Sequence, residues 1–390
     1  PSESEEVTVT VLDLKATEGF LGPKISILIP VYRESDLLEP LLTDLLRDPY
    51  RFKEVLVVID KPTEISINVV KRFQNKITFI LNGERVGKAK ALNELFKRTT
   101  GEILLFLDSD LQLQANRESF METLAREMEG VEILDIKKSI IRSSFQAKLV
   151  HYEYLASSLV SWLFSKKIGK CLGLNGAAFA IRREAFQRLG GFRRMLSEDF
   201  DLATRSFLEK LSFKYSDKVA VSVKPCSDWR SWYKQRKRWS IATGVWLKGY
   251  YRQLAGIVVS RPQVMLLSLP LMLPSLVLLP LNFLLPDAIY CQATSLALLI
   301  LASYASLALP FTFPATFGIP VAKNVLAAVL SYAGFSAIYF LSAKKLGYCF
   351  NPGEFLCFYF IYAPISLLMI IIGLFRVATH NDRIDLDWKV

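Results

Sequence analysis

The sequence predicts an α/β protein: a doubly wound, mostly parallel sheet, then interfacial helices, then a C-terminal bundle of about four transmembrane helices. Strand-like and helix-like segments alternate four times in the first 110 residues, and the last third of the chain has long runs without charge. The expected boundaries are 1–22 for an N-terminal extension, 23–223 for the sheet domain, 224–261 for a basic-aromatic region, and 262–390 for the transmembrane domain and tail.

The predicted sheet is built from four apolar runs of the kind that buried parallel strands show. They lie at Pro23–Val31, Glu54–Ile59, Ile77–Leu81 and Glu102–Leu107. Segments with helical spacing separate them, at Leu37–Leu46, Ile65–Phe73 and Gly87–Arg98. In such sheets ligands bind at the carboxyl ends of the strands. Asp60 and Asp108 each follow a strand directly, which favours a binding role over a core role for both.

Two acidic motifs carry the candidate chemistry. Asp108-Ser109-Asp110 follows an apolar strand, and two carboxylates at that position suit a hard cation such as Mg²⁺ or Mn²⁺ together with phosphate oxygens. A solvated acidic loop is the alternative. The second motif, Ser197-Glu198-Asp199, is followed by Asp201. Those acids offer a proton acceptor, or they only favour the start of a helix through its dipole.

Three other segments suit either a ligand or ordinary packing. The stretch Gly173–Gly191 is rich in small residues that let a ligand approach the backbone, or it is only a tight turn into a helix. Tyr152–Phe164 is an interfacial helix or a core helix. Lys224–Arg252 has eight basic residues, one acid and seven interleaved Trp and Tyr, which is typical of a helix at a membrane surface. Nucleic acid is disfavoured as a partner because apolar spans follow immediately.

The last third of the chain predicts the membrane domain. Residues Pro262–Val390 hold only six of the 48 Lys and Arg and five of the 37 Asp and Glu. Their uncharged runs match the roughly 20 residues that cross a bilayer core. Four spans are expected, near Val264–Leu285, Ile289–Leu309, Val325–Ala343 and Phe355–Phe375. Buried helices of a soluble protein are the alternative. Basic residues before the first span place the sheet domain on the cytoplasmic side of a multi-pass cell-membrane protein.

Several site types are disfavoured. The five cysteines include no CxxC pair, and His151 and His380 are the only histidines. The sequence therefore disfavours a zinc site, a disulfide framework and a Ser-His-Asp mechanism.

In this order the motifs resemble glycosyltransferase family 2, whose members are inverting enzymes of the GT-A fold. The matching stretches are Ile29–Glu34 (IPVYRE), Asp60, Gly87–Asn93, Asp108–Asp110 (DSD), Gly173–Phe192, Ser197–Arg205 and Gln235–Trp239 (QRKRW). The last stretch is similar to the QxxRW signature of the synthase-like branch, which includes cellulose, chitin and hyaluronan synthases and ceramide glucosyltransferase.

The resemblance implies a role for each matched residue. It implies that Mn²⁺ or Mg²⁺ is held by Asp108 and Asp110. It implies that a nucleotide-diphosphate sugar donor is bound by Pro30, Tyr32, Glu34, Asp60, Lys88, Asp108, Ser109 and Arg238. It implies that the acceptor is bound by Trp239, Gln235 and Gly176. It implies that catalysis rests on Asp199 as general base, with Glu198 and with Arg238 against the leaving diphosphate.

The acceptor expected is a hydroxyl of a lipid-linked glycan or glycolipid at the bilayer. A phosphate acceptor is already ionised and needs no base, so a base at Asp199 favours a hydroxyl. A processive polysaccharide synthase and a polyprenyl-phosphate sugar synthase remain alternatives, and so does a membrane transporter with a nucleotide-binding module.

Overall fold

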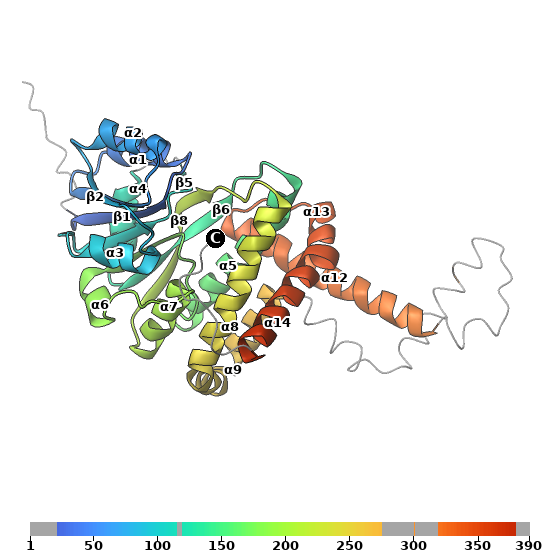
Figure 1. The fold of residues 1–390 in the computed structure, drawn as a ribbon. Helices are drawn as coiled ribbons and strands as arrows, with labels where there is room; N and C mark the ends of the chain where they lie inside the picture. The colour runs from blue at the N-terminus through green and yellow to red at the C-terminus, as the bar shows by residue number, and fades with distance from the viewer. Residues whose placement is uncertain (1–21, 115–118, 275–299, 301–318, 380–390) are drawn as a thin grey trace, which may run out of the picture.

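A computed structural model describes residues 22–114, 119–274, 300 and 319–379 of the chain. A twisted sheet with helices on both faces forms the first half (Figure 1). Long helices pack beside it: α5 contacts the sheet, α8 packs against α9 and α14, and α12 extends away.

The sheet has eight strands in the order β3-β2-β1-β4-β7-β6-β8-β5. In chain order they are β1 Ile25–Tyr32, β2 Lys53–Asp60, β3 Thr78–Asn82, β4 Ile103–Leu107, β5 Leu111–Leu113, β6 Ile133–Ile140, β7 Ala178–Arg182 and β8 Phe213–Val223. The four apolar runs of the sequence therefore form the neighbouring strands β3, β2, β1 and β4, each within two residues of its predicted start.

The sheet is mixed, which corrects the prediction that it is mostly parallel. Four strand pairings are parallel, and three, β4–β7, β6–β7 and β5–β8, are antiparallel. The antiparallel strand β7 enters the sheet beside β4, so the start of β7 meets the end of β4, with Ala178 opposite Leu107. That reversal brings the glycine-rich segment before β7 next to the Asp108–Asp110 motif.

The helices of the sheet domain are α1 Leu38–Arg47, α2 Glu64–Phe73, α3 Lys88–Phe96, α4 Phe120–Glu127, α5 Phe145–Lys167, α6 Arg183–Arg188 and α7 Glu198–Leu208. Those that follow are α8 Trp229–Ser260, α9 Pro262–Met272, α12 Ile319–Leu346, α13 Pro352–Cys357 and α14 Ala363–Thr379, with a π-helical turn at Phe358–Tyr362.

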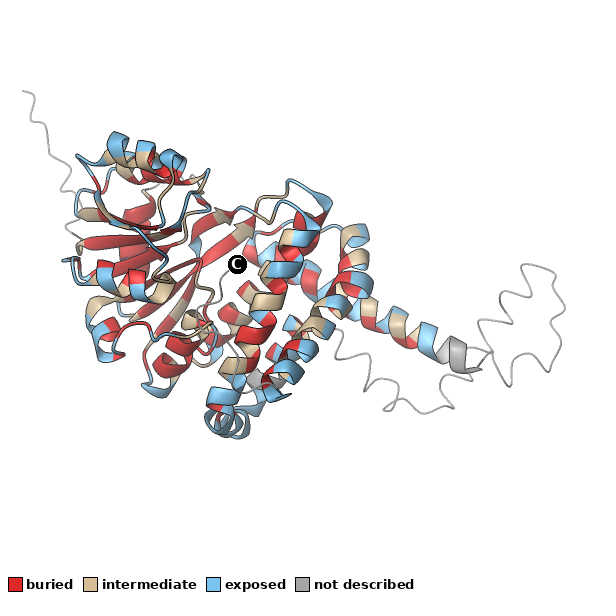
Figure 2. Cartoon of the chain, viewed as in Figure 1, coloured by how far each residue is buried: buried red, intermediate tan, exposed pale blue. Residues whose placement is uncertain are grey.

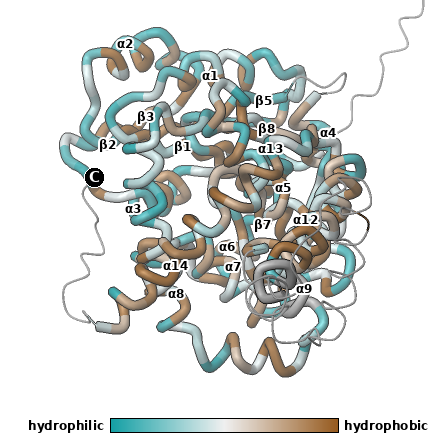
Figure 3. The backbone as a smooth tube through the Cα atoms, turned by 90° about the vertical axis from the view of Figure 1, so that its right-hand side faces the viewer, coloured by the Kyte–Doolittle hydropathy of each residue, from teal (hydrophilic) through white to brown (hydrophobic). Residues whose placement is uncertain are grey.

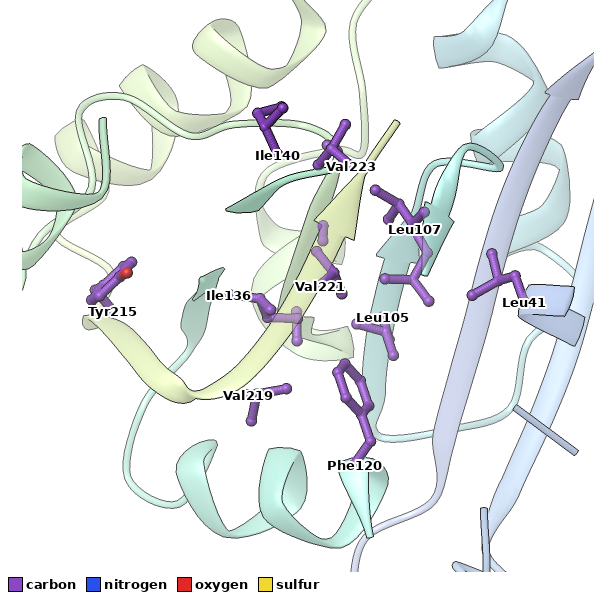
Figure 4. Close-up of a cluster of buried hydrophobic side chains, with 14 of the residues drawn as sticks. Leu41, Leu105, Leu107, Phe120, Ile136, Ile140, Tyr215, Val219, Val221 and Val223 are labelled. Atoms are coloured by element: carbon purple, nitrogen blue, oxygen red, sulfur yellow. The ribbon is translucent and has the colours of Figure 1, made fainter. Parts of the chain in front are cut away.

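The centre of the sheet is buried on both faces, as the uninterrupted apolar runs of β1 and β4 require (Figure 2). Ile27 of β1 joins a cluster with α1, α4 and α5, while its neighbour Leu28 joins a second cluster with α3, α6 and α7. Figure 4 shows part of the first cluster, where Leu105 of β4, Phe120 of α4 and Val221 of β8 approach one another.

Helix α5 resolves the two interpretations of Tyr152–Phe164 in favour of the core. The Tyr152 side chain is fully buried, and its hydroxyl donates to the carbonyl of Asn351 at 3.0 Å. His151 contacts the carbonyl of Cys349 through Nε2 at 2.9 Å. Helix α5 therefore anchors the connection between α12 and α13 to the sheet domain.

Two helical stretches in the described part of the chain are long and apolar enough to cross a membrane: Asn324–Leu346 and Pro352–Thr379. They match the third and fourth predicted spans, and their apolar character is visible in Figure 3. The predicted bundle of about four spans is not confirmed. Helix α9 covers only the beginning of the first span, and the second span, Ile289–Leu309, lies outside the described residues apart from Ile300.

A glycine contact joins α8 to α14. A Cβ atom on Gly373 would lie 2.6 Å from the carbonyl carbon of Ser240, and one on Gly244 would lie 2.8 Å from Val377 Cγ2. Neither site has room for a methyl group, so glycine sets the close approach of the two helices. The segment that follows the sheet domain is thereby fixed against a candidate membrane span.

Candidate active site

One cavity of about 1840 Å³ lies between the carboxyl edge of the sheet and the helices α8, α9 and α14. Nine of the residues that the sequence singled out line it: Lys88, Asp108, Asp110, Gly176, Glu198, Asp199, Gln235, Arg238 and Trp239. They come from segments that are far apart in the sequence, and the fold brings them to one space.

The Asp108–Asp110 motif is held by the strands on either side. The Asp108 backbone N–H donates to the carbonyl of Ala177 at 2.8 Å, and the Asp110 carbonyl accepts from the Lys224 N–H at 3.0 Å. The motif therefore bridges the start of β7 and the end of β8. Its two carboxylates face the cavity from a backbone that is fixed at both ends.

Lys88 is the cation of the site. Its Nζ lies 2.7 Å from Asp108 Oδ1 and 3.6 Å from Glu198 Oε1, and it donates to the Gly176 carbonyl at 3.4 Å. Burial alone would lower the pKa of Lys88, but these carboxylates outweigh it and raise that pKa. Lys88 is therefore charged and joins the two acidic motifs electrostatically.

Asp60 is engaged by the protein itself. Its Oδ2 accepts from the backbone N–H groups of Val86 and Gly87, both at 3.0 Å, and its Oδ1 accepts from the Asn82 amide at 2.8 Å. Gly87 has φ +91°, a conformation that favours glycine, and it immediately precedes α3 and Lys88. The observed contacts make Asp60 an anchor for the turn that presents Lys88.

Asp199 lies in the first turn of α7, and backbone groups orient its carboxylate. Oδ2 accepts from the Gly176 N–H at 3.0 Å, and Oδ1 accepts from the Phe200 N–H at 2.8 Å. Burial in the cavity floor raises the pKa of Asp199, and Lys88 opposes the rise. Burial also raises the pKa of Glu198, in the same surroundings.

Gly176 therefore contacts the carboxylate of Asp199 directly. A Cβ atom at this position would lie 3.0 Å from Asp199 Oδ2. The third acid of the segment, Asp201, is fully buried and is paired with Arg205, while the Tyr250 hydroxyl donates to it at 2.6 Å. Asp201 thus fastens α7 to α8 and does not face the cavity.

The QxxRW residues lie on α8, whose first turn is capped by Asp228 accepting from the Ser231 N–H at 2.8 Å. Gln235, Arg238 and Trp239 all line the cavity, and Trp239 is 38% exposed. The sequence missed two further charged residues on the same wall. Arg236 is buried and forms an ion pair with Glu153 of α5.

Five predicted donor-binding residues lie outside the lining of this cavity: Pro30, Tyr32, Glu34, Asp60 and Ser109. Pro30 instead lines a small hollow that Lys88, Asp108 and Asp199 share. The Tyr32 ring is covered by the Arg85 guanidinium at 4.5 Å, and Glu34 accepts from the Thr63 hydroxyl at 2.6 Å. The Ser109 carbonyl accepts from the Ser35 hydroxyl at 2.7 Å.

The carboxylates of Asp108 and Asp110 could supply two of the oxygen ligands that a hard divalent cation needs. Enclosure by the protein and the neighbouring charge of Asp108 raise the pKa of Asp110 to about 6, as expected for two carboxylates that share one space. No group of three or more His, Cys, Asp or Glu that could hold a metal occurs among the described residues. Mg²⁺ is commonly bound through one or two carboxylates with waters and substrate phosphates completing its shell.

The far wall of the cavity is apolar. It is made by side chains of α9 and α14, among them Leu269, Met272, Leu367, Ile370 and Leu374. The cavity is therefore lined both by acidic, basic and aromatic groups and by side chains of a candidate membrane span.

Comparison with known proteins supports one family. Residues 26–190 match the model of the family described as Glycosyl transferase family 2. A probable glycosyltransferase of Bacillus subtilis (strain 168), YdaM, is 23% identical over 235 residues, which cover 56% of this chain and 54% of that protein. Poly-beta-1,6-N-acetyl-D-glucosamine synthase of Staphylococcus aureus (strain MSSA476) is 22% identical over 222 residues, covering 55% and 53%.

The chain thus spans about half the length of the curated relatives it matches. Among solved structures, the mannosyltransferase PcManGT from Pyrobaculum calidifontis, in complex with GDP-Man and Mn²⁺, is 21% identical. The match covers 80% of this chain and 88% of that one, with a TM-score of 0.48.

Proposed function

We propose a specific reaction for this chain, from the premise that residues 26–190 match the model of Glycosyl transferase family 2. The enzyme is membrane-bound and inverting, and it moves a sugar from a nucleotide-diphosphate sugar to a hydroxyl of a lipid-linked glycan or glycolipid.

One observation carries the proposal: a single cavity contains the two acidic motifs, the QxxRW side chains and an apolar wall. Transfer from an ionic donor to an amphipathic acceptor needs charged and apolar surfaces within reach of one another. The cavity has both, and this arrangement is what an acceptor with an apolar chain would require.

Asp199 is the proposed general base. An inverting transfer needs one carboxylate that takes the proton of the attacking hydroxyl on the face opposite the leaving group. Two backbone N–H groups fix the orientation of the Asp199 carboxylate, and burial raises its pKa, which makes it a stronger base. Glu198, the neighbouring residue, keeps Lys88 close through its charge.

Cationic groups complete the proposed donor site. Negative charge grows on the diphosphate as the sugar leaves, and fixed positive groups stabilise it. Lys88 and Arg238 both line the cavity, and Arg offers a planar pair of donors that matches phosphate. Asp108 and Asp110 would hold Mn²⁺ or Mg²⁺, which supplies further positive charge against the diphosphate.

The proposed acceptor site begins at Trp239, whose flat ring suits a sugar face, with Gln235 beside it and Gly176 across the cavity. The exposed side of α8 carries Trp229, Tyr233 and Tyr251, each more than half exposed. Aromatic residues interleaved with basic ones suit a membrane surface. We therefore place the enzyme at the cell membrane, multi-pass, with its catalytic domain on the cytoplasmic side.

Donor binding is the first test. The purified chain in detergent is heated with UDP-GlcNAc, UDP-glucose or GDP-mannose, each with and without Mn²⁺. A donor that binds the folded state raises the melting temperature, and Asp108→Ala should abolish the Mn²⁺-dependent part. Asp217→Ala, at an exposed carboxylate on β8, is the matched control. No stabilisation by any sugar nucleotide would contradict the proposal.

The acceptor is tested with n-octyl β-D-glucoside, a sugar hydroxyl attached to an apolar chain. The donor that binds is incubated with it, and products are identified by mass spectrometry. One added sugar supports the proposal. The poly-N-acetylglucosamine synthase relatives favour a second candidate, a processive polysaccharide synthase, which would give a ladder of products instead. Transfer only to a polyprenyl phosphate would identify the third alternative.

A further inference from the structure

A buried ion pair lies in the wall of the cavity, behind the QxxRW motif. Arg236 of α8 is only 8% exposed and pairs with Glu153 of α5. Both residues line the cavity. Arg236 lies within the QRKRW stretch and Glu153 within Tyr152–Phe164, but neither residue has a role in the reaction proposed above.

The Arg236 guanidinium is stacked between aromatic rings. Its Cζ lies 4.3 Å from the centroid of Trp239 and 5.7 Å from that of Trp232. These residues are spaced i, i+4 and i+7, so they share one face of α8. A guanidinium at this distance attracts an aromatic ring electrostatically and limits its rotation.

Glu153 fixes the other side of Arg236 and connects it to α14. Ser366 donates to Glu153 Oε1 at 3.4 Å. Arg236 meets the other carboxylate oxygen, Glu153 Oε2, through Nη2. The pair thus connects α5, α8 and α14 at the point where Trp239 enters the cavity.

Stability alone is a weak explanation for such a pair. Removing two charges from water costs more than their attraction commonly returns, and apolar residues of similar size often serve as well. Asp135 and Lys138 form another buried pair in β6, away from the cavity lining. What distinguishes the Glu153–Arg236 pair is that its Arg236 guanidinium lies over the Trp239 ring.

We propose that Glu153 and Arg236 are positioning residues that hold the Trp239 ring in the orientation that receives the acceptor. The inference rests on the proposed function, because it takes Trp239 as the acceptor platform. It goes further by assigning the orientation of that platform to a charge pair: Arg236, from the unassigned second position of the QRKRW stretch, and Glu153, from α5.

The ring itself gives the first readout, without any substrate. The chain has six tryptophans, and labelling with 5-fluorotryptophan gives each a ¹⁹F resonance. Trp239→Phe identifies the signal of Trp239. We expect Glu153→Gln to shift or broaden that signal, because Arg236 loses its anchor. Asp135→Asn should leave it unchanged, since that variant breaks a buried pair elsewhere.

Two further variants keep the test decisive if Glu153→Gln folds poorly. Arg236→Lys retains the charge opposite Glu153 but loses the planar group over Trp239, so it should also move the signal. Glu153→Asp retains the charge and should restore most of the wild-type signal. An unmoved Trp239 resonance in Arg236→Lys and Glu153→Gln would overturn the proposal.

Kinetics then separate this proposal from the function it rests on. With n-octyl β-D-glucoside as acceptor, Glu153→Gln should raise the acceptor KM about tenfold and leave the donor KM within twofold. If Trp239→Ala raises the acceptor KM and Glu153→Gln does not, the positioning role is wrong. If Trp239→Ala also leaves the acceptor KM unchanged, Trp239 does not bind the acceptor and that part of the proposed function is wrong.

Discussion

A methyl group at Gly176 tests the orientation of Asp199 more finely than removal of the carboxylate. In Gly176→Ala the new Cβ would lie 3.0 Å from Asp199 Oδ2, whereas ordinary contacts begin near 3.4 Å. The carboxylate must therefore move by about 0.4 Å. Misplacement by 1 Å costs on the order of 100-fold in rate, so a proportional loss for this displacement is about sixfold in kcat.

The assay is steady-state transfer at saturating donor and acceptor, with the donor affinity measured separately. We expect kcat to fall about sixfold while donor binding stays within twofold, because Gly176 contacts the base and not the anchored acidic motif. Gly256→Ala is the matched control, at an exposed helical glycine with no atom within 4 Å of the new Cβ. A wild-type kcat in Gly176→Ala, or a loss confined to donor affinity, would refute the reasoning.

Three other predictions follow from the same geometry. Asp199→Asn should lower kcat by roughly 10²–10⁴-fold at unchanged donor affinity. Asp199 can accept a proton only when it is ionised, and burial raises its pKa above the ordinary value of 3.8. The kcat of the wild-type enzyme should therefore increase as the pH is raised above about 4. If kcat of Asp199→Asn shows the same increase with pH, a different residue is titrating and the assignment to Asp199 is wrong. Gly373→Ala should destabilise by about 1–3 kcal/mol, because its methyl meets the α8 backbone, and should lower the melting temperature by several degrees. Gly334→Ala, with open space around it, should not.

The four parallel strands were predictable because each reads as an apolar run. Strands β1, β2 and β4 are largely buried, whereas β3, at the edge of the sheet, is only partly covered. Strand β6 was missed for a physical reason. It carries Asp135, Lys137 and Lys138, all buried, in the segment ILDIKKSI. The Lys138–Asp135 pair neutralises charges that, in the sequence, suggest a solvated surface. Because three of the eight residues of β6 are charged, its sequence shows no apolar pattern from which a buried strand could be predicted.

The site residues that belong to short sequence motifs could be predicted. Residues that are far apart in the sequence and contact each other only in the folded chain could not. Asp108, Asp199 and Trp239 reach the cavity as expected. Glu153 and Arg236 meet across α5 and α8, so no spacing in the sequence relates them. The position of Arg236, three residues before Trp239 and four after Trp232, was the one signal available.

The glycine contact between α8 and α14 has a mechanical consequence. Helix α8 has 32 residues and is therefore a rod about 48 Å long, with the QxxRW residues towards one end and Gly244 at its midpoint. Because α14 packs tightly against the middle of this long helix, a tilt of α14 would also tilt α8. That tilt would move the QxxRW residues that line the cavity. If α14 crosses the membrane, bilayer thickness becomes a variable of the reaction, and turnover in vesicles of short- and long-chain lipids is the measurement that would reveal it.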